Sequence, residues 1–529
     1  MTAQRRAIIL AAGVGKRMAP LSYELPKALL SVRGEVLIER LISQLRESGV
    51  DDVTVVTGYM KESLFYLEDE LGAKIRVNAD YADTGSASSL LIARDMLANA
   101  WVCSSDQYFE QNPFLGLGEE SACSVMERPA AKGELRIKLD EEGFVCAASV
   151  QGSGRYVLEG PAFFCEADGI RFASILEEDS QKPGFSSLLW DQVFAQHVGD
   201  IRFRARKLAP QDVHEFKSFN DLVAFDRDFV ENVDLTILDN ICATLGCERR
   251  DISEVIPIKQ GLTNLSFRFD CKGETYVYRH PGAGTDEIIN RAAETHALNI
   301  ARELGLDETF VYEDPEEGWK LSRFIEGCEP FDYENLDQVR QALGMAKRLH
   351  ESGKTSPWSF DYRLEAEKIA DILRAMHYPL PRDFSELAQR MGRLADHLAS
   401  DGGAPVLCHN DFYGPNLLVR GDEMQLIDWE YSAMGDYACD LGNFVAQGSN
   451  YPPEKTLEVI DLYYGRPATP AEQRHCLAAV ALVGWYWYVW AIYKGAKGSP
   501  VGEWLYIWYR AARTYCDAAM PLYEEEAHE

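Results

Sequence analysis

Three polar residues in the last third of the chain have the types and the spacing of a phosphate-transfer site. Asp411 and Asn416 are separated by four residues, and Asp428 follows the apolar pair Leu426 and Ile427. An aspartate can orient and deprotonate an attacking hydroxyl group, while an asparagine and a second aspartate can hold Mg2+ beside the phosphates of ATP. Each residue alone could serve in a turn or a helix cap. All three in this order predict Asp411 as a catalytic base and Asn416 and Asp428 as metal ligands.

Two charged residues upstream fit the same chemistry. Arg279 lies on a predicted strand, and Glu294 lies on the predicted helix that follows it. Their ion pair could hold the α- and β-phosphates of ATP, and a solvated surface pair is the alternative. Between two predicted strands, the segment QGLTN places Thr263 and Asn264 where a turn that covers phosphates is expected. Both are therefore candidate nucleotide contacts.

A second phosphate site is predicted near the N-terminus. An apolar, strand-like run leads into the glycine-rich sequence AAGVGKRM, whose backbone N–H groups could approach phosphates while its two cations neutralise them. Lys27 follows a proline a short distance later. For the glycines alone, a tight turn of any α/β protein is the alternative. The candidate nucleotide contacts of this loop are Ala11, Ala12, Gly13, Gly15, Lys16 and Arg17.

The elements that must position the N-terminal loop alternate between strands and helices. Apolar runs such as Ala7–Ala11 and Val53–Thr57 are followed by helical patterns near Leu37–Ser48 and Lys61–Leu71. This βαβ order predicts an α/β domain of the Rossmann-like type, with the glycine-rich loop at the carboxyl edge of a parallel sheet. Open sheets of this kind bind their ligands at that edge.

The second part of the chain begins with antiparallel strands and then becomes mostly helical. Strands are predicted within Ile256–Phe269 and Glu274–Arg279, a helix near Asp286–Leu304, and mainly helices after Glu326. A small β-rich lobe followed by a larger helical lobe is the order of kinase-like α+β folds. The predicted domains are residues 1–232 and 233–529, the latter divided into a small lobe, 233–327, and a helical lobe, 328–529.

The composition excludes several classes of partner. The 84 acidic and 53 basic side chains give a net charge of −31, which repels nucleic acid and anionic membrane surfaces. The 12 cysteines form no CxxC pair and no regular framework, so a reducing cytoplasm is expected. Cys476–Tyr493 is apolar and long enough for a membrane span. Its aromatic residues lie in its middle rather than at its ends, which predicts a buried helix that lines an aromatic pocket.

Several motifs of the first part resemble the sugar-nucleotide pyrophosphorylase-like transferases, and most closely the bacterial CTP:phosphocholine cytidylyltransferases. They are AIILAAGVGKRMAPLSYELPKALLSV, VVTGYMKESLFYL, NADYADTGSASSL, SSDQYF and LLWDQV, and the resemblance covers nearly all of residues 5–228. It implies that Lys27 stabilises the reacting phosphate oxygens and that Asp106 binds Mg2+. Transfer of this kind needs alignment and charge neutralisation more than a general base.

The same resemblance implies roles for further residues. Glu215 is the candidate second metal ligand, while Lys217 stands where the family usually has another acidic residue. Trp190 and Asp191 could offer an aromatic face and a countercharge to a quaternary ammonium group. A tryptophan that the family carries in its middle segment has no match near residues 132–139. Two serines of the motif NADYADTGSASSL are candidate nucleotide contacts, Ser86 and Ser88.

The second part, roughly residues 256–515, resembles the choline/ethanolamine kinase branch of the aminoglycoside phosphotransferase-like superfamily. The motifs that carry this resemblance are GLTNLSFRF, SRFIEG, CHNDFYGPNLLV, LIDWEYSAMGDYACDLGN and a late aromatic helix. It implies the same roles for Asp411, Asn416 and Asp428. Choline kinases often carry an acidic residue where this chain has Gln447. The candidate contacts of the amino alcohol are Trp429, Glu430, Trp485, Trp487 and Trp490, and helical spacing lets only some rings of the late helix face one pocket.

The two resemblances together predict a bifunctional, cytoplasmic enzyme that makes CDP-choline. Its second domain would phosphorylate choline with ATP, and its first would transfer CMP from CTP to phosphocholine with release of pyrophosphate. Mg2+ is expected at both sites, the expected partners are these small molecules alone, without nucleic acid or membrane insertion, and the oligomeric state is left open. The alternatives are ethanolamine or another amino alcohol, a sugar-phosphate nucleotidyltransferase joined to a sugar or aminoglycoside kinase, and a regulatory protein with inactive halves. The intact set of polar candidates argues against the last.

Overall fold

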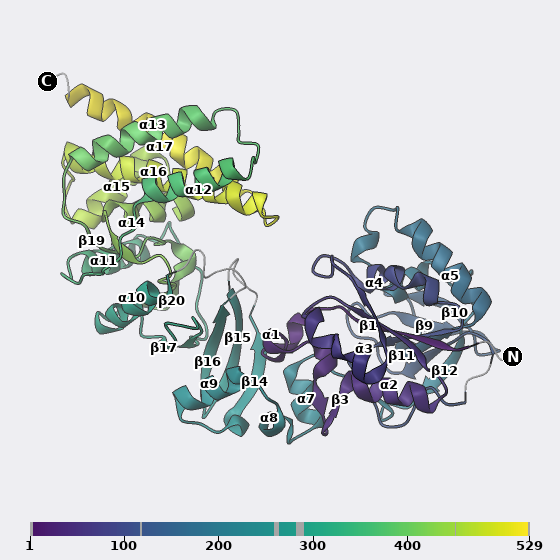
Figure 1. Ribbon diagram of the computed structural model, residues 1–529. Helices are drawn as coiled ribbons and strands as arrows, with labels where there is room; N and C mark the ends of the chain where they lie inside the picture. The colour runs from purple at the N-terminus through teal and green to yellow at the C-terminus, as the bar shows by residue number, and fades with distance from the viewer. Residues whose placement is uncertain (1–3, 117–118, 259–263, 282–289, 450, 527–529) are drawn as a thin grey trace. The chain divides into compact units, whose positions relative to one another are not determined.

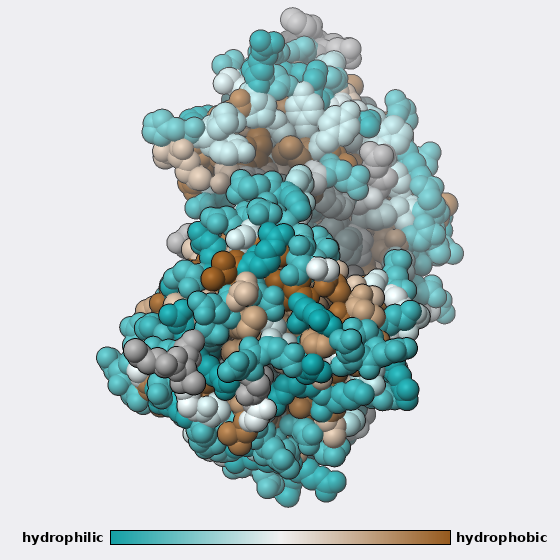
Figure 2. Space-filling model, turned by 90° about the vertical axis from the view of Figure 1, so that its right-hand side faces the viewer, coloured by the Kyte–Doolittle hydropathy of each residue, from teal (hydrophilic) through white to brown (hydrophobic). Residues whose placement is uncertain are grey.

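The computed structural model describes residues 4–116, 119–258, 264–281, 290–449 and 451–526 (Figure 1). Contacts divide the chain into two compact units, Met1–Lys259 with Ser266–Glu274, and Gln260–Leu265 with Thr275–Glu529. The first unit extends beyond residue 232 because helix α9 (Thr236–Leu245) and strand β14 (Ile252–Pro257) pack within it. For example, the backbone N–H of Thr236 donates to the Glu24 carboxylate over 2.9 Å. The surface drawn in Figure 2 is largely hydrophilic, as the excess of acidic side chains predicts.

A nine-stranded sheet is the centre of the first unit. Its strand order is β10-β9-β11-β6-β1-β4-β5, with β8 paired to β11 and β12 paired to β8. Strands β6, β1, β4 and β5 run parallel, whereas β11 lies antiparallel to β6. The bounds are β1 (Arg6–Ala11), β4 (Asp52–Thr57), β5 (Lys74–Val77), β6 (Ala100–Ser104), β8 (Ala122–Glu127), β9 (Arg136–Leu139), β10 (Val145–Ser149), β11 (Tyr156–Phe164) and β12 (Arg204–Leu208). The carboxyl ends of β1 and β6 therefore meet at one edge of the sheet.

Helices cover both faces of this sheet. Those that cover it or carry site residues are α2 (Leu37–Glu47), α4 (Ser86–Ile92), α5 (Glu166–Asp179) and α6 (Trp190–Gln196). Ile9 of β1 packs in one apolar cluster with Leu41 of α2, whereas its neighbour Ile8 packs in a second cluster with Leu90 of α4. Because β1 is covered on both sides, its sequence is a continuous apolar run rather than an alternating one.

The second unit starts with three antiparallel strands in the order β16-β18-β17, and most of the rest of it is helical. The strands are β16 (Glu274–Pro281), β17 (Phe310–Glu313) and β18 (Lys320–Arg323). The helices are α10 (Arg291–Glu303), α11 (Leu336–His350), α12 (Tyr362–Ala375), α13 (Phe384–Ser400), α14 (Ala438–Asn443), α15 (Pro453–Tyr464), α16 (Pro470–Ala496) and α17 (Trp504–Glu526). This order of a β-rich part and then a helical part agrees with the sequence prediction.

Two short antiparallel strand pairs interrupt the helices and hold the predicted phosphate-transfer motif. Strand β19 (Val406–Cys408) pairs with β22 (Ala433–Gly435), and β20 (Leu417–Arg420) pairs with β21 (Glu423–Leu426). The segment that carries Asp411 and Asn416 lies between β19 and β20, and Asp428 follows β21. Short strands on either side therefore hold the ends of both functional segments.

Helix α16 contains the apolar run whose length would also fit a membrane span. Among the described residues it is the one helix of that length and hydropathy, and 94% of its most apolar 18-residue window is buried. A proline at its first turn and a Thr469 side chain that accepts the backbone N–H of Glu472 fix its start. The helix is thus buried within the second unit.

Candidate active sites

A cavity of about 300 Å³ opens in the first unit at the carboxyl ends of β1 and β6. The glycine-rich loop follows β1 and Asp106 follows β6, so the parallel pairing of these strands brings both segments to one edge. Eight predicted residues line the cavity: Ala11, Ala12, Gly13, Gly15, Lys27, Ser86, Asp106 and Trp190. Lys16, Arg17 and Ser88 are not among its lining residues, and the two cations are exposed on the short turn after the loop.

Lys27 and Asp106 form an ion pair on the wall of this cavity. The distance from Lys27 Nζ to Asp106 Oδ2 is 3.1 Å, and the two side chains are 16% and 19% exposed. Ser104 donates to the other carboxylate oxygen over 2.6 Å. Gly15 has φ +67°, and a Cβ there would lie 2.7 Å from Lys27 Cε. Only glycine therefore lets Lys27 lie across the phosphate loop without strain.

Glu215 is brought to the same place by a two-stranded pairing. Strand β13 (Val213–Glu215) lies antiparallel to β7 (Gln107–Phe109), and Glu215 is opposite Gln107, the residue after Asp106. Burial raises the pKa of Glu215, and the charge of Asp106 raises it further. Two carboxylates that repel each other in this way are a donor set that fits a divalent cation.

Lys217 lies two residues after Glu215 and is not free. Its ammonium group is 2.7 Å from the Glu134 carboxylate and 3.4 Å from that of Glu215. Burial opposes its charge, but hydrogen bonding and charge from Glu134 and Glu215 raise the pKa of Lys217. A cation therefore stands beside the candidate metal ligand, where the resemblance leads one to expect an acid.

Trp190 and Asp191 begin helix α6. The backbone N–H of Trp190 donates to Ser86 Oγ over 3.0 Å, which joins the start of α6 to the start of α4. The Trp190 ring packs edge-on against Phe164, with centroids 6.3 Å apart. Asp191 Oδ1 is buried without a hydrogen-bond partner in the described part of the chain, and burial raises the pKa of this carboxyl group.

Residues that sequence reasoning did not single out also line the cavity. Asn78, Thr84 and Ser89 belong to the motif NADYADTGSASSL, and Tyr81 lies between them. Asn78 Nδ2 donates to Thr84 Oγ1 over 3.1 Å and to Ser89 Oγ over 3.0 Å. The motif itself was the signal, but which of its polar side chains face the cavity depends on how the loop before α4 folds.

In the second unit, Asp411 is held by donors on both of its oxygens. Asn416 Nδ2 donates to Oδ2 over 2.9 Å, and Gln447 Nε2 donates to Oδ1 over 2.7 Å. Burial raises the pKa of Asp411 to about 7, while the Gln447 and Asn416 hydrogen bonds oppose that rise. A general base whose pKa lies near working pH is well matched to proton transfer.

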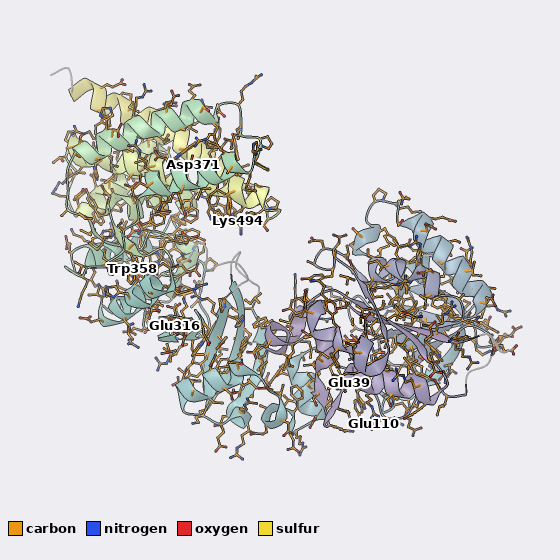
Figure 3. The ribbon with its side chains drawn as sticks, in the orientation of Figure 1. Glu39, Glu110, Glu316, Trp358, Asp371 and Lys494 are labelled. Carbon is orange, nitrogen blue, oxygen red and sulfur yellow. The ribbon has the colours of Figure 1, made fainter. Side chains whose placement is uncertain are left out.

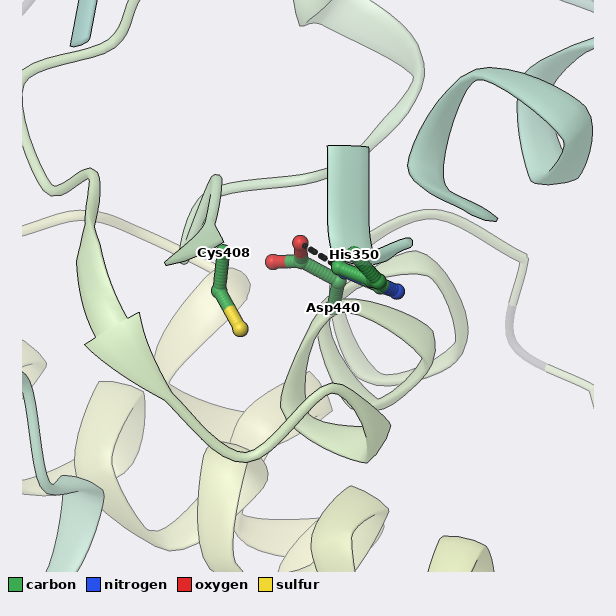
Figure 4. Close-up of side chains that lie close together, drawn as sticks. All are labelled: His350, Cys408 and Asp440. Atoms are coloured by element: carbon green, nitrogen blue, oxygen red, sulfur yellow. Dashed lines mark hydrogen bonds and ion pairs between the residues drawn. The ribbon is translucent and has the colours of Figure 1, made fainter. Parts of the chain in front are cut away.

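Asp440 lies in a buried cluster with His350 and Cys408 and supports the backbone of the loop before Asp411 (Figure 4). Asp440 accepts the backbone N–H groups of His409 over 2.8 Å and Asn410 over 2.7 Å. His350 Nε2 lies 2.9 Å from the same carboxylate, and Cys408 completes a cluster whose ligand-type atoms lie within 4.8 Å of one another. Both oxygens of Asp440 already accept backbone hydrogen bonds, so this cluster acts as a structural support of the loop.

Asp428 lies close to the Asp411 segment and is open to solvent. The backbone N–H of Ile427 donates to the carbonyl of Asn416 over 2.9 Å, which joins the two candidate metal segments. The Asp428 side chain is 45% exposed. Its φ of +70° is uncommon for a residue with a Cβ, and such conformations occur often at functional sites. An amide and a carboxylate oxygen at this place are donors that suit Mg2+.

Arg279 lies at the centre of a buried cluster of charges. Its guanidinium group is 2.7 Å from Glu294, 2.8 Å from Glu313 and 2.9 Å from Glu430, and its side chain is only 8% exposed. Burial alone would lower the pKa of Arg279, but the charges of Glu294 and Glu430 raise it. Arg279 and Glu294 are therefore a buried, two-point ion pair rather than a solvated one.

Lys320 and Glu313 belong to this cluster although the sequence did not suggest them. Lys320 Nζ is 3.0 Å from Glu294, and strand pairing places Lys320 opposite both Arg279 and Glu313. Their membership depends on the register of β16, β18 and β17, which no local motif encodes. Of the predicted turn residues nearby, Thr263 lies outside the described residues and Asn264 begins strand β15 (Asn264–Cys271).

The predicted aromatic residues do not gather around one space. Trp487 Nε1 donates to Asn443 Oδ1 over 2.9 Å, and Trp490 packs against Trp487 at 5.5 Å between centroids. Trp485 instead lines a cavity of about 540 Å³ that also borders Asp371 of α12, which is labelled in Figure 3. Trp429 is fully buried, and its indole N–H donates to the Leu426 carbonyl over 2.9 Å.

Two family models match the chain. The MobA-like NTP transferase domain matches residues 7–113, and the phosphotransferase enzyme family matches residues 254–475. The first match contains Lys27 and Asp106, and the second contains Arg279, Asp411 and the rest of the charged cluster. The fold and the two sites thus define a nucleotidyltransferase domain followed by a kinase-like phosphotransferase domain.

Known relatives match the two parts separately. The 2-aminoethylphosphonate cytidylyltransferase of Lancefieldella rimae is 31% identical over 228 residues, which are 42% of this chain and 93% of that protein. The choline-phosphate cytidylyltransferase of Streptococcus pneumoniae is 28% identical over 41% of this chain and 94% of that protein. Among solved structures, choline kinase LicA from Streptococcus pneumoniae is 22% identical to this chain in sequence. The match covers 54% of this chain and 98% of the LicA chain, with a TM-score of 0.46. The chain belongs to the cytidylyltransferase family through its first part. Its second part matches the phosphotransferase enzyme family, so the predicted pairing of a nucleotidyltransferase with a phosphotransferase is confirmed.

Proposed function

We propose that this chain converts choline into CDP-choline in two steps, one at each site. The observation that carries the proposal is that one chain holds both sites. Phosphocholine, the product proposed for the second domain, is also the acceptor proposed for the first. The kinase-like domain would act first, although it comes second in the sequence. Both steps use soluble nucleotides, so the reactions would take place in the cytoplasm without nucleic acid or membrane partners.

In the first step, the hydroxyl oxygen of choline attacks the γ-phosphorus of ATP. The bond between that phosphorus and the bridging oxygen breaks, ADP leaves, and the hydroxyl proton passes to Asp411. Hydrogen bonds from Asn416 and Gln447 hold the Asp411 carboxylate in one orientation. Arg279, fixed by its carboxylate partners, stands beside Asp428 at 3.8 Å and helps to balance the charge of the phosphates.

In the second step, a phosphate oxygen of phosphocholine attacks the α-phosphorus of CTP. The bond to the β-phosphate oxygen breaks and pyrophosphate leaves, so no proton needs to be transferred. Lys27 and the backbone N–H groups of the glycine-rich loop stabilise the charge on the phosphate oxygens. Trp190, on the wall of the same cavity, offers an aromatic face to the cationic head group.

Two donor sets fit Mg2+ by their chemistry. Asp106 and Glu215 would hold one ion in the first domain, and Asn416 and Asp428 would hold one in the second. The observation that supports the first set is the pairing of β13 with β7, which places Glu215 opposite the residue that follows Asp106. Burial, and then the charge of Asp106, raise the pKa of Glu215. When bound, the ion supplies positive charge to the phosphate oxygens.

Ethanolamine is the second candidate substrate. A relative of the first domain is named as a 2-aminoethylphosphonate cytidylyltransferase, whose substrate carries a primary amine. The buried Asp191 Oδ1 lacks a hydrogen-bond donor within the described residues, and a primary ammonium group could donate where trimethylammonium cannot. These two observations favour an aminoethyl head group, while the choline kinase-like second domain favours choline.

The test uses the purified chain with ATP, CTP, Mg2+ and either choline or ethanolamine, followed by phosphorus NMR of the products. Asp411→Ala is expected to abolish phosphorylation of the alcohol and to leave CDP-choline formation from supplied phosphocholine intact. Asp106→Ala is expected to do the reverse. Loss of both activities in either variant would contradict the two-site proposal. Turnover of ethanolamine far above that of choline would identify ethanolamine as the substrate.

A further inference from the structure

We propose that Gln447 is a positioning residue, which aligns the Asp411 carboxylate toward the hydroxyl group of the acceptor alcohol. The proposal rests on the proposed function, because it assumes that Asp411 is the base of the phosphotransfer. It is carried by three observations on the Gln447 side chain and the turn around it. No charge on Gln447 itself is involved.

The first observation is the backbone conformation that presents Gln447. Helix α14 continues directly into a π-helical segment, η9 (Phe444–Ser449), and Gln447 lies within that segment. The π-helix is a rare conformation, and its single turns occur frequently at functional sites because they re-aim a side chain. Here the segment carries the buried Gln447 amide to Asp411.

The second observation is that the Gln447 amide donates to two neighbouring acceptors. Gln447 Nε2 donates to Asp411 Oδ1 over 2.7 Å and to Asn443 Oδ1 over 3.0 Å. Asn443 Oδ1 also accepts the indole N–H of Trp487, a group that can only donate, so the orientation of the Asn443 amide is fixed. Gln447 therefore faces two acceptors, and a carboxylate in its place would face them without a donor.

The third observation is a close contact that fixes the turn itself. A Cβ at Gly448 would lie 1.5 Å from the Tyr333 hydroxyl oxygen, so the backbone of η9 packs directly on that ring. The same hydroxyl accepts the backbone N–H of Gly414, in the segment between Asp411 and Asn416, over 2.6 Å. Tyr333 thus ties the turn that carries Gln447 to the loop that carries the base.

Taken together, these contacts remove the rotational freedom of Asp411. Asn416 holds Oδ2, Gln447 holds Oδ1, and neither amide can turn away without losing a buried partner. A base that must meet a hydroxyl group in line with the γ-phosphorus loses rate steeply when its orientation is lost. The effect should therefore appear in the chemical step rather than in nucleotide binding.

The experiment compares the Gln447→Glu and Gln447→Met variants of the full-length chain with the wild-type chain. Both variants keep the length of the side chain and remove its N–H donor. We expect kcat for phosphorylation of the alcohol to fall about 10- to 100-fold in both, while KM for ATP changes less than twofold. Gln341→Glu makes the same change at an exposed position of α11, where the amide contacts a backbone carbonyl, and should leave kcat unchanged.

Three outcomes would overturn the proposal. The first is a wild-type kcat in both variants, and the second is a loss in Gln447→Glu alone, which would make the effect one of charge. The third is a parallel rise in KM for ATP with a lower melting temperature, which would indicate a structural role only. Cytidylyl transfer to supplied phosphocholine should be unchanged throughout, and a wild-type chain that phosphorylates no amino alcohol would instead contradict the proposed function.

Discussion

The two phosphate sites of this chain arrange their charges in different ways. In the first unit, one lysine and one aspartate form a partly exposed ion pair beside a glycine-rich loop. In the second, Arg279 is almost completely buried among Glu294, Glu313 and Glu430. The first site therefore offers mainly backbone groups of the glycine-rich loop to the phosphates, whereas the second depends mainly on a cluster of buried charged side chains.

The difference in burial between the two charge arrangements determines whether a substitution changes stability as well as activity. Removing one member of a buried charge cluster leaves other charges without a partner, which costs several kcal/mol of folding free energy. Removing one member of a partly exposed pair costs less, because water can reach the partner that remains. The comparison predicts that substitutions of the Lys27–Asp106 pair should affect activity alone, while substitutions within the buried Arg279 cluster should affect activity and folding together.

The largest effect is expected for Arg279→Met. The substitution removes the cation that lies closest to the buried carboxylates of Glu313 and Glu430, so the free energy of unfolding of the second unit should fall by about 3–5 kcal/mol. Phosphorylation of the alcohol should be lost as well. Urea unfolding followed by far-ultraviolet circular dichroism measures the change. A smaller shift would mean that the cluster protonates and relaxes without penalty.

Arg363 provides the matched control in the same unit. It pairs with Glu367 over 3.0 Å and with Asp396 over 2.5 Å, but its side chain is 38% exposed. Arg363→Met should change the free energy of unfolding by less than about 1 kcal/mol. Equal losses in the two arginine variants would remove the distinction between buried and exposed charge on which the comparison rests.

The next effect concerns the first site and should appear in activity alone. Lys27→Met removes the cation that faces the reacting phosphates, so kcat for cytidylyl transfer should fall on the order of 10²- to 10³-fold. The melting temperature of the first unit should hardly change, because the ion pair is partly solvated. A calorimetric scan and a pyrophosphate-release assay measure the two quantities on one preparation.

Lys16 is the control for this prediction, since it belongs to the same glycine-rich motif. It is exposed and does not line the cavity. Lys16→Met should therefore reduce cytidylyl transfer much less than Lys27→Met does. If both variants lost activity equally, the loop would have to close over the nucleotide and bring Lys16 to the phosphates.

Local motifs predicted most of what lies close together in sequence. The glycine-rich loop, Lys27 and the Asp411 to Asn416 spacing all lie within short segments. The loop follows the end of β1, and the segment that carries Asp411 follows the end of β19. Gly15 shows why such motifs are readable, because its positive φ and its contact with Lys27 are requirements of a few neighbouring residues. Strand β1 was likewise predicted from one continuous apolar run.

Contacts between distant segments could not be predicted in the same way. Lys320 joins the charge cluster through strand register, and Gln447 reaches Asp411 through a π-helical turn that no propensity encodes. Trp485 and Trp487 lie two positions apart on a helix that is apolar all round, so composition could not tell which ring faces which neighbour. Trp485 borders a separate cavity, and Trp487 reaches the network around Asp411.

Buried charge in the second unit also occurs away from the phosphate site. His475 of α16 lies 3.0 Å from Asp401 and 2.9 Å from Asp436. Burial opposes the charged form, but hydrogen bonds and charges of Asp436 and Asp401 outweigh it and raise the pKa of His475. If the second unit depends on buried charge in general, this histidine should also contribute to its stability.

The smallest predicted effect is therefore a pH-dependent loss of stability in His475→Gln. Because the folded pKa of His475 is raised above the unfolded value of about 6.5, the histidine stabilises the fold fully below that pH. The contribution declines as the pH rises through the folded pKa, since the proton is then lost in both states. We expect the variant to be less stable by about 1–2 kcal/mol at pH 6, with a smaller difference at pH 9. Urea titrations at the two pH values measure this, with His377→Gln, at an exposed position, as the control that should show no such trend. If the loss of unfolding free energy in His475→Gln were larger at pH 9 than at pH 6, the histidine would stabilise the fold by packing and not by its charge. The stabilising role of buried charge in the second unit would then be limited to the phosphate site.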